Sequence, residues 1–250
     1  MASAAPVLLL DQTDSTNAEA RRRAEAGETG PLWITARRQT AGRGRRGRSW
    51  ESDTGNLFGT LLLTTRKAPA EAAQITFIAA LAVADLLDGY APPSLVTIKW
   101  PNDVMLAGEK ASGVLVESGA HPSGGLWLAV GIGVNLAHAP TGTERPATSL
   151  AQHLRGDIAA PPSPETAGAQ LAQAFSVWLE RWQALGFEPI LDAWTARTTG
   201  LDGPAVARLG HETVEGRAEG VAPDGALKLR LADGTLRLIS AGDVFFGELA

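Results

Sequence analysis

The sequence predicts an α+β protein built on a largely antiparallel sheet, with helices packed against it and a small β-barrel at the C-terminal end. Short β-branched runs separated by Pro, Asn, Asp or Gly recur over residues 95–135. Two longer segments, 70–87 and 165–185, repeat apolar residues with helical spacing. From about residue 201 the pattern changes to alternating short strands, which is typical of a separate β unit.

Length and composition set the first limits. A chain of 250 residues allows one large domain or one domain with a small appendage. With 44% apolar and 20% charged residues, it is not a disordered chain, a collagen or a coiled coil. The longest apolar stretch, about residues 75–84, is roughly half of the ~20 residues that cross a bilayer, so we expect no membrane span. No secretory signal is evident and there is no cysteine, so we expect a cytoplasmic protein without disulfides, thiolate metal sites or a cysteine nucleophile.

The first third of the chain alternates strands with one helix. Residues 7–10 form a short apolar strand, and the Asp14–Asn17 run offers capping side chains, with Thr16 and Glu19 in capping-box spacing. A helix is therefore predicted over 18–26, ending at Gly27. Residues 32–36 and 57–65 read as strands, and the Gly- and Arg-rich segment 39–50 between them reads as a loop.

The rest of the chain completes the sheet and adds the barrel. Residues 70–87 predict an amphipathic helix packed on the sheet. Strands follow over 95–99, 104–106, 112–117 and 126–135, and helices over 165–185 and 190–196, whose aromatic stripe we interpret as core. Hairpin turns at residues 224–225 and 233–234 fit a barrel of about 45 to 50 residues. We therefore expect one larger domain over 1–200 and a barrel over 201–250.

Charge is distributed unevenly. The formal net charge is −5, but residues 37–48 contain six arginines and no acid, which leaves −11 for the remainder. An acidic remainder would repel long nucleic acid, whereas a compact anionic ligand would suit such a patch.

We call residues 39–50 the Gly/Arg loop. Its glycines let backbone N–H groups approach an anion, and its arginines supply forked donors for phosphate or carboxylate. Trp50, at its end, could stack on a base. An RNA-binding arginine–glycine segment is the alternative, but this loop is brief and lies between two strands, so we favour a loop that closes on a substrate. Like charges and few apolar anchors predict that it is mobile until ligand anions order it.

Three further motifs stand out. Asn102 beside Asp103 makes a turn that could hold a purine edge or a magnesium ion. Lys110 lies at the start of an apolar strand. An isolated lysine at such a position usually protects an exposed sheet edge from pairing with another strand, so a functional role for Lys110 has this structural alternative. Gly131 and Gly133 in one strand indicate the close approach of a ligand or another backbone, while the missing third glycine excludes a dinucleotide fingerprint. The four histidines are scattered without metal-ligand spacing, and we expect them at the surface or in loops.

Taken in order, Asp14–Asn17, the Gly/Arg loop and the motifs at 99–104, 110–117 and 131–135 closely resemble the biotin–protein ligase family. The match is dense over residues 8–136 and continues weakly through Gly220, 224–227 and 242–244. The resemblance implies a central mixed sheet flanked by helices, a class II synthetase-like ligase fold, and an SH3-like C-terminal barrel. It implies a two-step reaction, in which biotin and ATP give biotinyl-5′-adenylate and the biotinyl group passes to a lysine of a biotin carboxyl carrier protein.

The resemblance also implies roles for individual residues, which are assigned by their positions in the motifs. Biotin would be contacted by Ser15, Thr16, Asn17, Gln39, Gly42, Arg43, Gly44, Arg45, Lys110, Gly113 and Leu115. ATP and the adenylate would be bound by Arg43, Arg48, Trp50, Asn102, Asp103 and Asn135. Arg45 and Lys110 would be the catalytic residues, and Mg²⁺ would accompany ATP on ligands that the sequence does not identify.

The chemistry agrees with these residue types. Attack of a carboxylate on the α-phosphate brings two anions together, so arginine, lysine and magnesium must offset their repulsion. Arg43, Arg45 and Lys110 suit that task. Transfer then needs a neutral acceptor amine and stabilisation of oxyanion charge, with no cysteine or serine nucleophile.

Alternatives remain at this stage. A lipoate–protein ligase would share the fold and the adenylate chemistry, and a nucleic-acid-binding module could use residues 37–48. The motifs that resemble the ligase family begin near the start of the sequence and leave no room for a helix-turn-helix. We therefore expect a monofunctional ligase without DNA binding. The family often places an arginine after the last barrel strand, but this chain has Gly247 there, which leaves ATP phosphate contacts from the barrel open. Monomer and homodimer are both compatible with the sequence.

Overall fold

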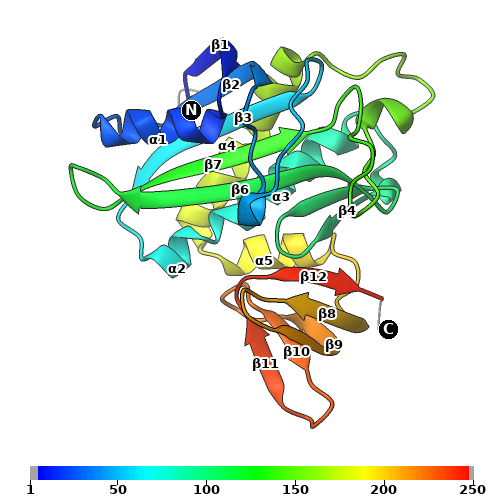
Figure 1. Ribbon diagram of the computed structural model, residues 1–250. Coiled ribbons are helices and arrows are strands. Elements are labelled where there is room, and N and C mark those ends of the chain that lie inside the picture. The colour runs from blue at the N-terminus through cyan, green and yellow to red at the C-terminus, as the bar shows by residue number, and fades with distance from the viewer. Residues whose placement is uncertain (1–4, 248–250) are drawn as a thin grey trace.

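The computed structural model describes residues 5–247, which form two sheets and the helices around them (Figure 1). The larger sheet has seven strands in the order β1-β2-β3-β7-β6-β5-β4. In chain order they are β1 (Val7–Thr13), β2 (Leu32–Gln39), β3 (Leu57–Thr65), β4 (Val96–Lys99), β5 (Asp103–Leu106), β6 (Glu109–Ala120) and β7 (Leu126–Val134). Only β1 and β2 pair in parallel, so the predicted mixed, mostly antiparallel sheet is confirmed.

Helices cover both faces of this sheet, because successive strand residues point to opposite sides. On one face, Ala20 and Ala24 of α1 (Thr16–Glu25) pack on Ile34, Leu62 and Ala129. The other face is covered by α3 (Ile75–Asp88) and α4 (Pro164–Leu185), with α5 (Glu188–Thr195) packed against both helices. Short helical turns complete the unit: α2 (Pro69–Ala72), η1 (Arg45–Gly47), η2 (Pro93–Leu95) and η3 (Leu150–Gln152).

The predicted amphipathic helix over 70–87 differs from the structure in two ways. It is divided into α2 and α3, and α3 is apolar on nearly every side, with residues 79–84 all buried. The reason is its position between the sheet, α4 and α5, which leaves no solvated face. Residues 69–88 are long and apolar enough to cross a membrane, but two-thirds of that stretch is buried in the protein core.

The smaller sheet is entirely antiparallel, in the order β11-β10-β9-β8-β12. Its strands are β8 (Pro204–Arg208), β9 (Thr213–Val221), β10 (Leu227–Arg230), β11 (Leu236–Ile239) and β12 (Asp243–Phe246). Short inward side chains such as Ala205 and Ala207, with Leu227 and Leu229, form its buried side. Because α5 ends at Thr195 and β8 begins at Pro204, we propose to place the domain boundary at residues 200–201.

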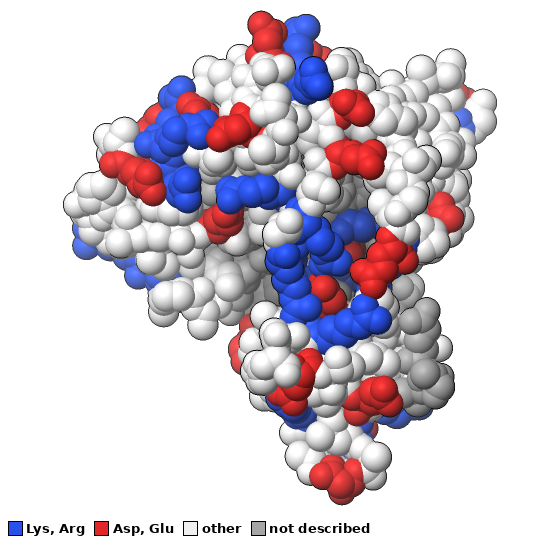
Figure 2. Space-filling view, in the orientation of Figure 1, with Lys and Arg blue, Asp and Glu red and all other residues white. Residues whose placement is uncertain are grey.

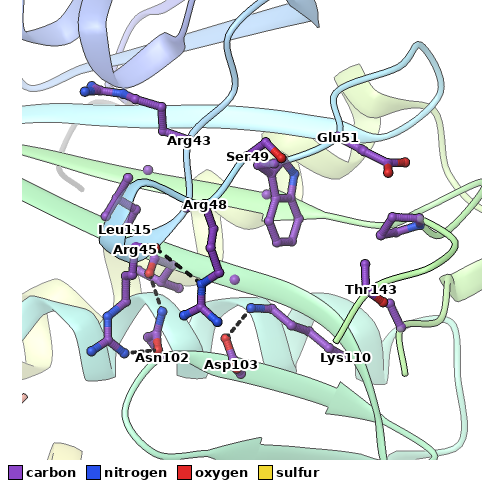
Figure 3. A pocket seen from close by; sticks show the side chains of 18 of the residues that line it. Arg43, Arg45, Arg48, Ser49, Glu51, Asn102, Asp103, Lys110, Leu115 and Thr143 are labelled. Carbon is purple, nitrogen blue, oxygen red and sulfur yellow. Dashed lines mark hydrogen bonds and ion pairs between the residues drawn. The ribbon is translucent and has the colours of Figure 1, made fainter. Parts of the chain in front are cut away.

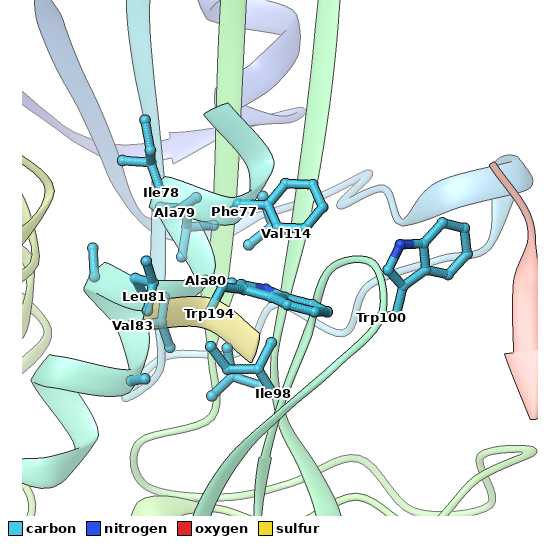
Figure 4. Close-up of a cluster of buried hydrophobic side chains, with 14 of the residues drawn as sticks. Phe77, Ile78, Ala79, Ala80, Leu81, Val83, Ile98, Trp100, Val114 and Trp194 are labelled. Atoms are coloured by element: carbon cyan, nitrogen blue, oxygen red, sulfur yellow. The ribbon is translucent and has the colours of Figure 1, made fainter. Parts of the chain in front are cut away.

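A buried cluster that includes Phe77, Trp100 and Trp194 lies near the junction of the two sheets (Figure 4). The Trp100 side chain, 2% exposed, donates its indole N–H to the Gly225 carbonyl in the C-terminal sheet at 3.0 Å. Nearby, Phe77 of α3 packs edge-on against Trp194 and Phe187. The C-terminal sheet therefore sits against the end of the larger sheet from which the β4–β5 turn projects.

Candidate active site

A pocket of about 530 Å³ lies where the two sheets meet. Its walls come from the start of α1, the Gly/Arg loop, the β4–β5 turn, the inner parts of β6 and β7, the segment 140–147 and residues 242–244. Of the site residues expected from the sequence, every one but Gly42 lines it. Gly42 stands behind the lining, where a Cβ atom would come within 2.5 Å of the Trp50 carbonyl oxygen, so its part is to let the loop turn tightly.

The first turn of α1 is polar and buried, and it supplies one wall. The expected capping box at Thr16 is wrong, because Ser15 is the N-cap and neither residue caps the helix through its side chain. Instead the Thr16 N–H and hydroxyl both donate to Oε1 of Gln39, at 2.8 and 3.2 Å. Gln39 also donates its amide to Ser52, which fixes the start of the Gly/Arg loop against α1.

Asn17 connects that turn to the floor of the sheet. Its amide nitrogen donates to Glu117 at 2.8 Å and to the Leu115 carbonyl at 3.2 Å, and its oxygen accepts from Thr60 at 2.7 Å. Room for this side chain comes from Gly131, since a Cβ there would lie 2.2 Å from Asn17 Oδ1. The close approach predicted at the glycines of β7 is thus filled here by the chain's own asparagine.

The Trp50 ring lies on two glycines of the sheet, Gly133 of β7 and Gly113 of β6. A Cβ at Gly133 would come 2.5 Å from its ring, and one at Gly113 would come 3.1 Å from it. The Lys110 ammonium lies 5.5 Å from the ring centroid, and the buried indole N–H has no hydrogen-bond partner within the described residues. The indole therefore rests on β6 and β7 inside the pocket, where an aromatic ligand could stack on it.

The arginines of the Gly/Arg loop are paired rather than left to repel one another, and Figure 3 shows one of these contacts, between Arg45 and Asn102. Arg43 pairs with Glu117 at 3.1 Å. Arg45 donates to Asn102 Oδ1 and to the Gly242 carbonyl, both at 2.8 Å. Arg46, in the left-handed backbone region, and Arg48 share Asp243 at 3.2 and 2.8 Å. Arg46 also donates to the Arg208 carbonyl at 2.8 Å, so the loop is attached to the C-terminal sheet at Arg208, Gly242 and Asp243.

Burial and charge act in opposite directions on these groups. Burial lowers the pKa of the Arg45 guanidinium, although Asp243 and Asp103 oppose that shift. Burial also raises the pKa of Asp243, but Arg48, Arg45 and Arg46 outweigh it and hold that pKa below its ordinary value. Arginine stays protonated in proteins, so both groups are charged at neutral pH.

Lys110 and the Asn102–Asp103 turn meet on the opposite side of the pocket. The Lys110 ammonium lies 2.6 Å from a carboxylate oxygen of Asp103. Asn102 donates its amide to the Val114 carbonyl at 2.7 Å, so its oxygen is presented to Arg45. The Asn135 amide donates to the Thr148 carbonyl at 3.0 Å, which gives this expected adenylate residue a role in holding the segment after 147.

Three parts of the site were not expected as ligand-contacting residues. Glu117 ends the motif that Lys110 begins, and its pairing with Arg43 and Asn17 needs the folded sheet. The segment 140–147 carries no motif, yet Arg145 in it lines the pocket. Asp243 was part of the weak C-terminal resemblance, which was the available signal for its place in the wall.

The carboxylates of the pocket do not form a metal cage. Within residues 5–247 no three His, Asp or Glu side chains gather as metal ligands, and Asp103 and Asp243 are paired with cations. Magnesium is held in many sites by one or two carboxylates together with substrate phosphates, and Asp103 fits such a site. Among the histidines, His121 lies in the loop between β6 and β7, as expected, and is buried there with its Nδ1 2.7 Å from Ser123.

Comparisons with known proteins agree with this geometry. Residues 9–136 match the biotin/lipoate A/B protein ligase family, and residues 206–247 match the biotin protein ligase C-terminal domain. The chain is 44% identical, over 96% of its length and 100% of the relative's, to a biotin–[acetyl-CoA-carboxylase] ligase of Paracoccus denitrificans. A ligase of the same name from Mycobacterium tuberculosis is 31% identical over 93% of this chain and 86% of its own.

Solved structures share the fold. A biotin protein ligase of Aquifex aeolicus in complex with biotin and ATP superimposes with a TM-score of 0.80 at 24% identity, covering 97% of this chain and 99% of that one. The Leishmania major enzyme in complex with biotinyl-5-AMP gives 0.62 at 25% identity, covering 94% and 99%. The chain is therefore a member of the biotin/lipoate A/B protein ligase family, in its biotin protein ligase branch.

Proposed function

We propose that the pocket carries out a two-step ligation, in which biotin is activated by ATP and then transferred to a lysine of a biotin carboxyl carrier protein. The observation that carries this proposal is the convergence of Arg45 and Trp50 of the Gly/Arg loop with Lys110 of β6 on one pocket beside an uncharged sheet surface. Such a site suits a ligand that is part apolar acid and part nucleotide.

Biotin belongs on the α1 side. Its ureido group needs donors and acceptors, and the Ser15–Asn17 turn with Gln39 offers both in a buried setting. The aliphatic chain would pass over Gly113 and Leu115, where the absence of a side chain at 113 leaves room. The carboxylate would then end beside Lys110 and Arg45.

The adenylate belongs on the Trp50 side. The indole offers a stacking face for adenine, and the cations Arg43, Arg45, Arg48 and Lys110 surround the place for the phosphate. In the first step a biotin carboxylate oxygen bonds to the α-phosphorus, while the bond from that phosphorus to the bridging oxygen breaks and pyrophosphate leaves. Mg²⁺ bound to the phosphates would supply further neutralisation of charge, with Asp103 as its protein ligand.

In the second step the neutral acceptor amine attacks the acyl carbon, a proton leaves the nitrogen, and AMP departs. Lys110 and Arg45 stabilise the oxygen charge that develops. The Gly/Arg loop excludes water, because a mixed anhydride open to solvent would hydrolyse.

The direct test is release of pyrophosphate on mixing the protein with ATP and biotin, followed by labelling of a carrier protein. Lipoate in place of biotin distinguishes the related ligase, and we expect turnover with biotin and little with lipoate. Tight, salt-sensitive binding to random single-stranded DNA without ligand would instead favour the nucleic-acid module. A cytoplasmic location belongs to this proposal, and monomer and homodimer are both compatible with it.

A further inference from the structure

A second group of cations surrounds Phe245, on the C-terminal sheet. The guanidinium carbon of Arg145 lies 3.7 Å from the centre of the Phe245 ring, and that of Arg208 lies 4.2 Å from it. The Lys99 ammonium lies at 5.7 Å. These three cations come from the segment 140–147, from β8 and from β4, so the folded chain brings them to one aromatic ring.

This group continues directly from Lys110. The Lys110 N–H donates to the carbonyl of Pro146 at 3.1 Å, and Arg145 is the preceding residue. Arg145 lines the pocket and donates to the Val244 carbonyl at 2.9 Å, which places it beside β12. Lys110 and Arg145 line the pocket, and Phe245 and Arg208 lie just outside its lining, stacked beside Arg145.

Positively charged side chains gather around Phe245. Arg208 pairs with Glu144 at 2.8 Å, but both side chains are more than half exposed, so an incoming anion can replace that carboxylate. The next carboxylate along the rim, Asp243, is shared by Arg46 and Arg48. Figure 2 shows the resulting collection of Lys and Arg side chains around the hollow between the two sheets.

We propose that Arg145 and Arg208, held in place by the ring of Phe245, bind the β- and γ-phosphates of ATP and stabilise the pyrophosphate leaving group. This inference rests on the proposed function. When the bond from the α-phosphorus to the bridging oxygen breaks, the electron pair stays on pyrophosphate, and two guanidinium forks offset that charge. The C-terminal sheet then supplies phosphate contacts from β8 and β12, although Gly247 after β12 has no side chain to offer.

The first experiment separates the two half-reactions in Arg145→Gln and Arg208→Gln. We expect each variant to raise the KM for ATP and the inhibition constant of pyrophosphate against ATP by about 10- to 100-fold, as loss of a charged hydrogen bond does. Biotin affinity should stay unchanged. Transfer from supplied biotinyl-5′-adenylate should remain within about twofold of wild type, because that step releases AMP and not pyrophosphate. Arg217→Gln, an exposed arginine on β9 of the same sheet, is the matched control.

Phe245 is a positioning residue, and its variants test the ring itself. Phe245→Leu should raise the KM for ATP by about 3- to 10-fold, and Phe245→Tyr should restore the wild-type value because it keeps the ring face. Phe246→Leu removes the neighbouring ring of β12, which packs near Gly200, and should leave the KM for ATP unchanged.

Two outcomes would overturn the inference. Equal losses in adenylation and transfer would mean that Arg145 and Arg208 only fasten the segment 140–147 to the C-terminal sheet. An unchanged KM for ATP together with an unchanged pyrophosphate constant would mean that no phosphate binds there. Calorimetric titration of inorganic pyrophosphate into wild type and Arg145→Gln keeps this test independent of the proposed function, since failure to form biotinyl-5′-adenylate would count against the ligation and not against the anion site.

Discussion

Lys110 lies where β6, β5 and the segment 146–148 meet, and its backbone groups and its ammonium group all have partners. Its backbone N–H and carbonyl pair with Pro146 and Thr148, while its ammonium contacts Asp103 at the start of β5. The backbone pairing survives any substitution that keeps the strand, so the charge can be removed without dismantling the wall. That separation makes the ammonium testable by itself.

We expect Lys110→Gln to lower the rate of adenylate formation by about 10²- to 10³-fold, the usual cost of removing one preorganised electrostatic contact. Transfer from added biotinyl-5′-adenylate should fall by a similar factor, because the same charge serves both steps. Separate assays of the two half-reactions measure this, with Lys228→Gln in the C-terminal sheet as control. Normal rates in both assays would remove Lys110 from the active site and leave it as a solubilising edge residue.

We expect the Trp50 side chain to contribute more to the binding of ATP than to the binding of biotin. Trp50→Ala removes the ring that lies on Gly133, and with it a stacking surface worth about 1 to 3 kcal/mol to adenine. Calorimetry with each ligand should therefore show a large loss of ATP affinity and a small change for biotin. A collapse of biotin binding with ATP unaffected would instead place the ring in the biotin pocket.

At the scale of the element, β7 shows how glycines make room for side chains. Gly131 and Gly133 face the pocket and leave room for Asn17 and Trp50, while Val130, Ile132 and Val134 alternate with them on the other face and belong to the hydrophobic core. The strand can therefore be a floor for ligands on one side and part of the core on the other. Adding one methyl group at a glycine that faces the pocket should therefore affect the site.

Gly133→Ala should impair adenylate formation, because its Cβ would lie 2.5 Å from Trp50 and would push the ring off the strand. Overpacking of this kind costs about 1 to 3 kcal/mol. Gly59→Ala in β3 is the control, since a Cβ there meets its nearest neighbour at an ordinary 3.6 Å. If both alanine variants react and bind ATP alike, the glycine at 133 is not making room for Trp50.

Sequence patterns predicted the strands well, because alternation and turn residues are local properties. The helix over 70–87 was mispredicted as amphipathic, since its burial on all sides depends on α4, whose sequence lies about 80 residues further along. In the site, the motif residues converge as expected. The partners of those residues, such as Glu117 for Arg43 and Asp243 for Arg48, depend on contacts between distant segments and could not be read from spacing.

At the scale of the whole molecule, the Gly/Arg loop joins the two sheets. Arg45 bonds to the Gly242 carbonyl, and Arg46 and Arg48 share Asp243. Arg45 and Arg48 also line the pocket, so ligand anions and the C-terminal sheet compete for them. Closure of the loop and seating of the C-terminal sheet are therefore coupled through the Asp243 carboxylate together with the carbonyl groups of Gly242 and Arg208.

Asp243→Asn should loosen the loop without unfolding the protein. Each ion pair is partly exposed and contributes about 1 kcal/mol or less, so the rate of tryptic cleavage at residues 43–48 should rise by about 2- to 10-fold in the free protein. Asp202→Asn, an exposed position outside the pocket, serves as control. Biotin with ATP should protect wild type and Asp243→Asn to the same final level, because bound anions then order the arginines in place of Asp243. Equal cleavage of wild type with and without ligands would show that the loop does not close on a substrate, and equal cleavage of the free wild-type and variant proteins would show that Asp243 does not restrain it.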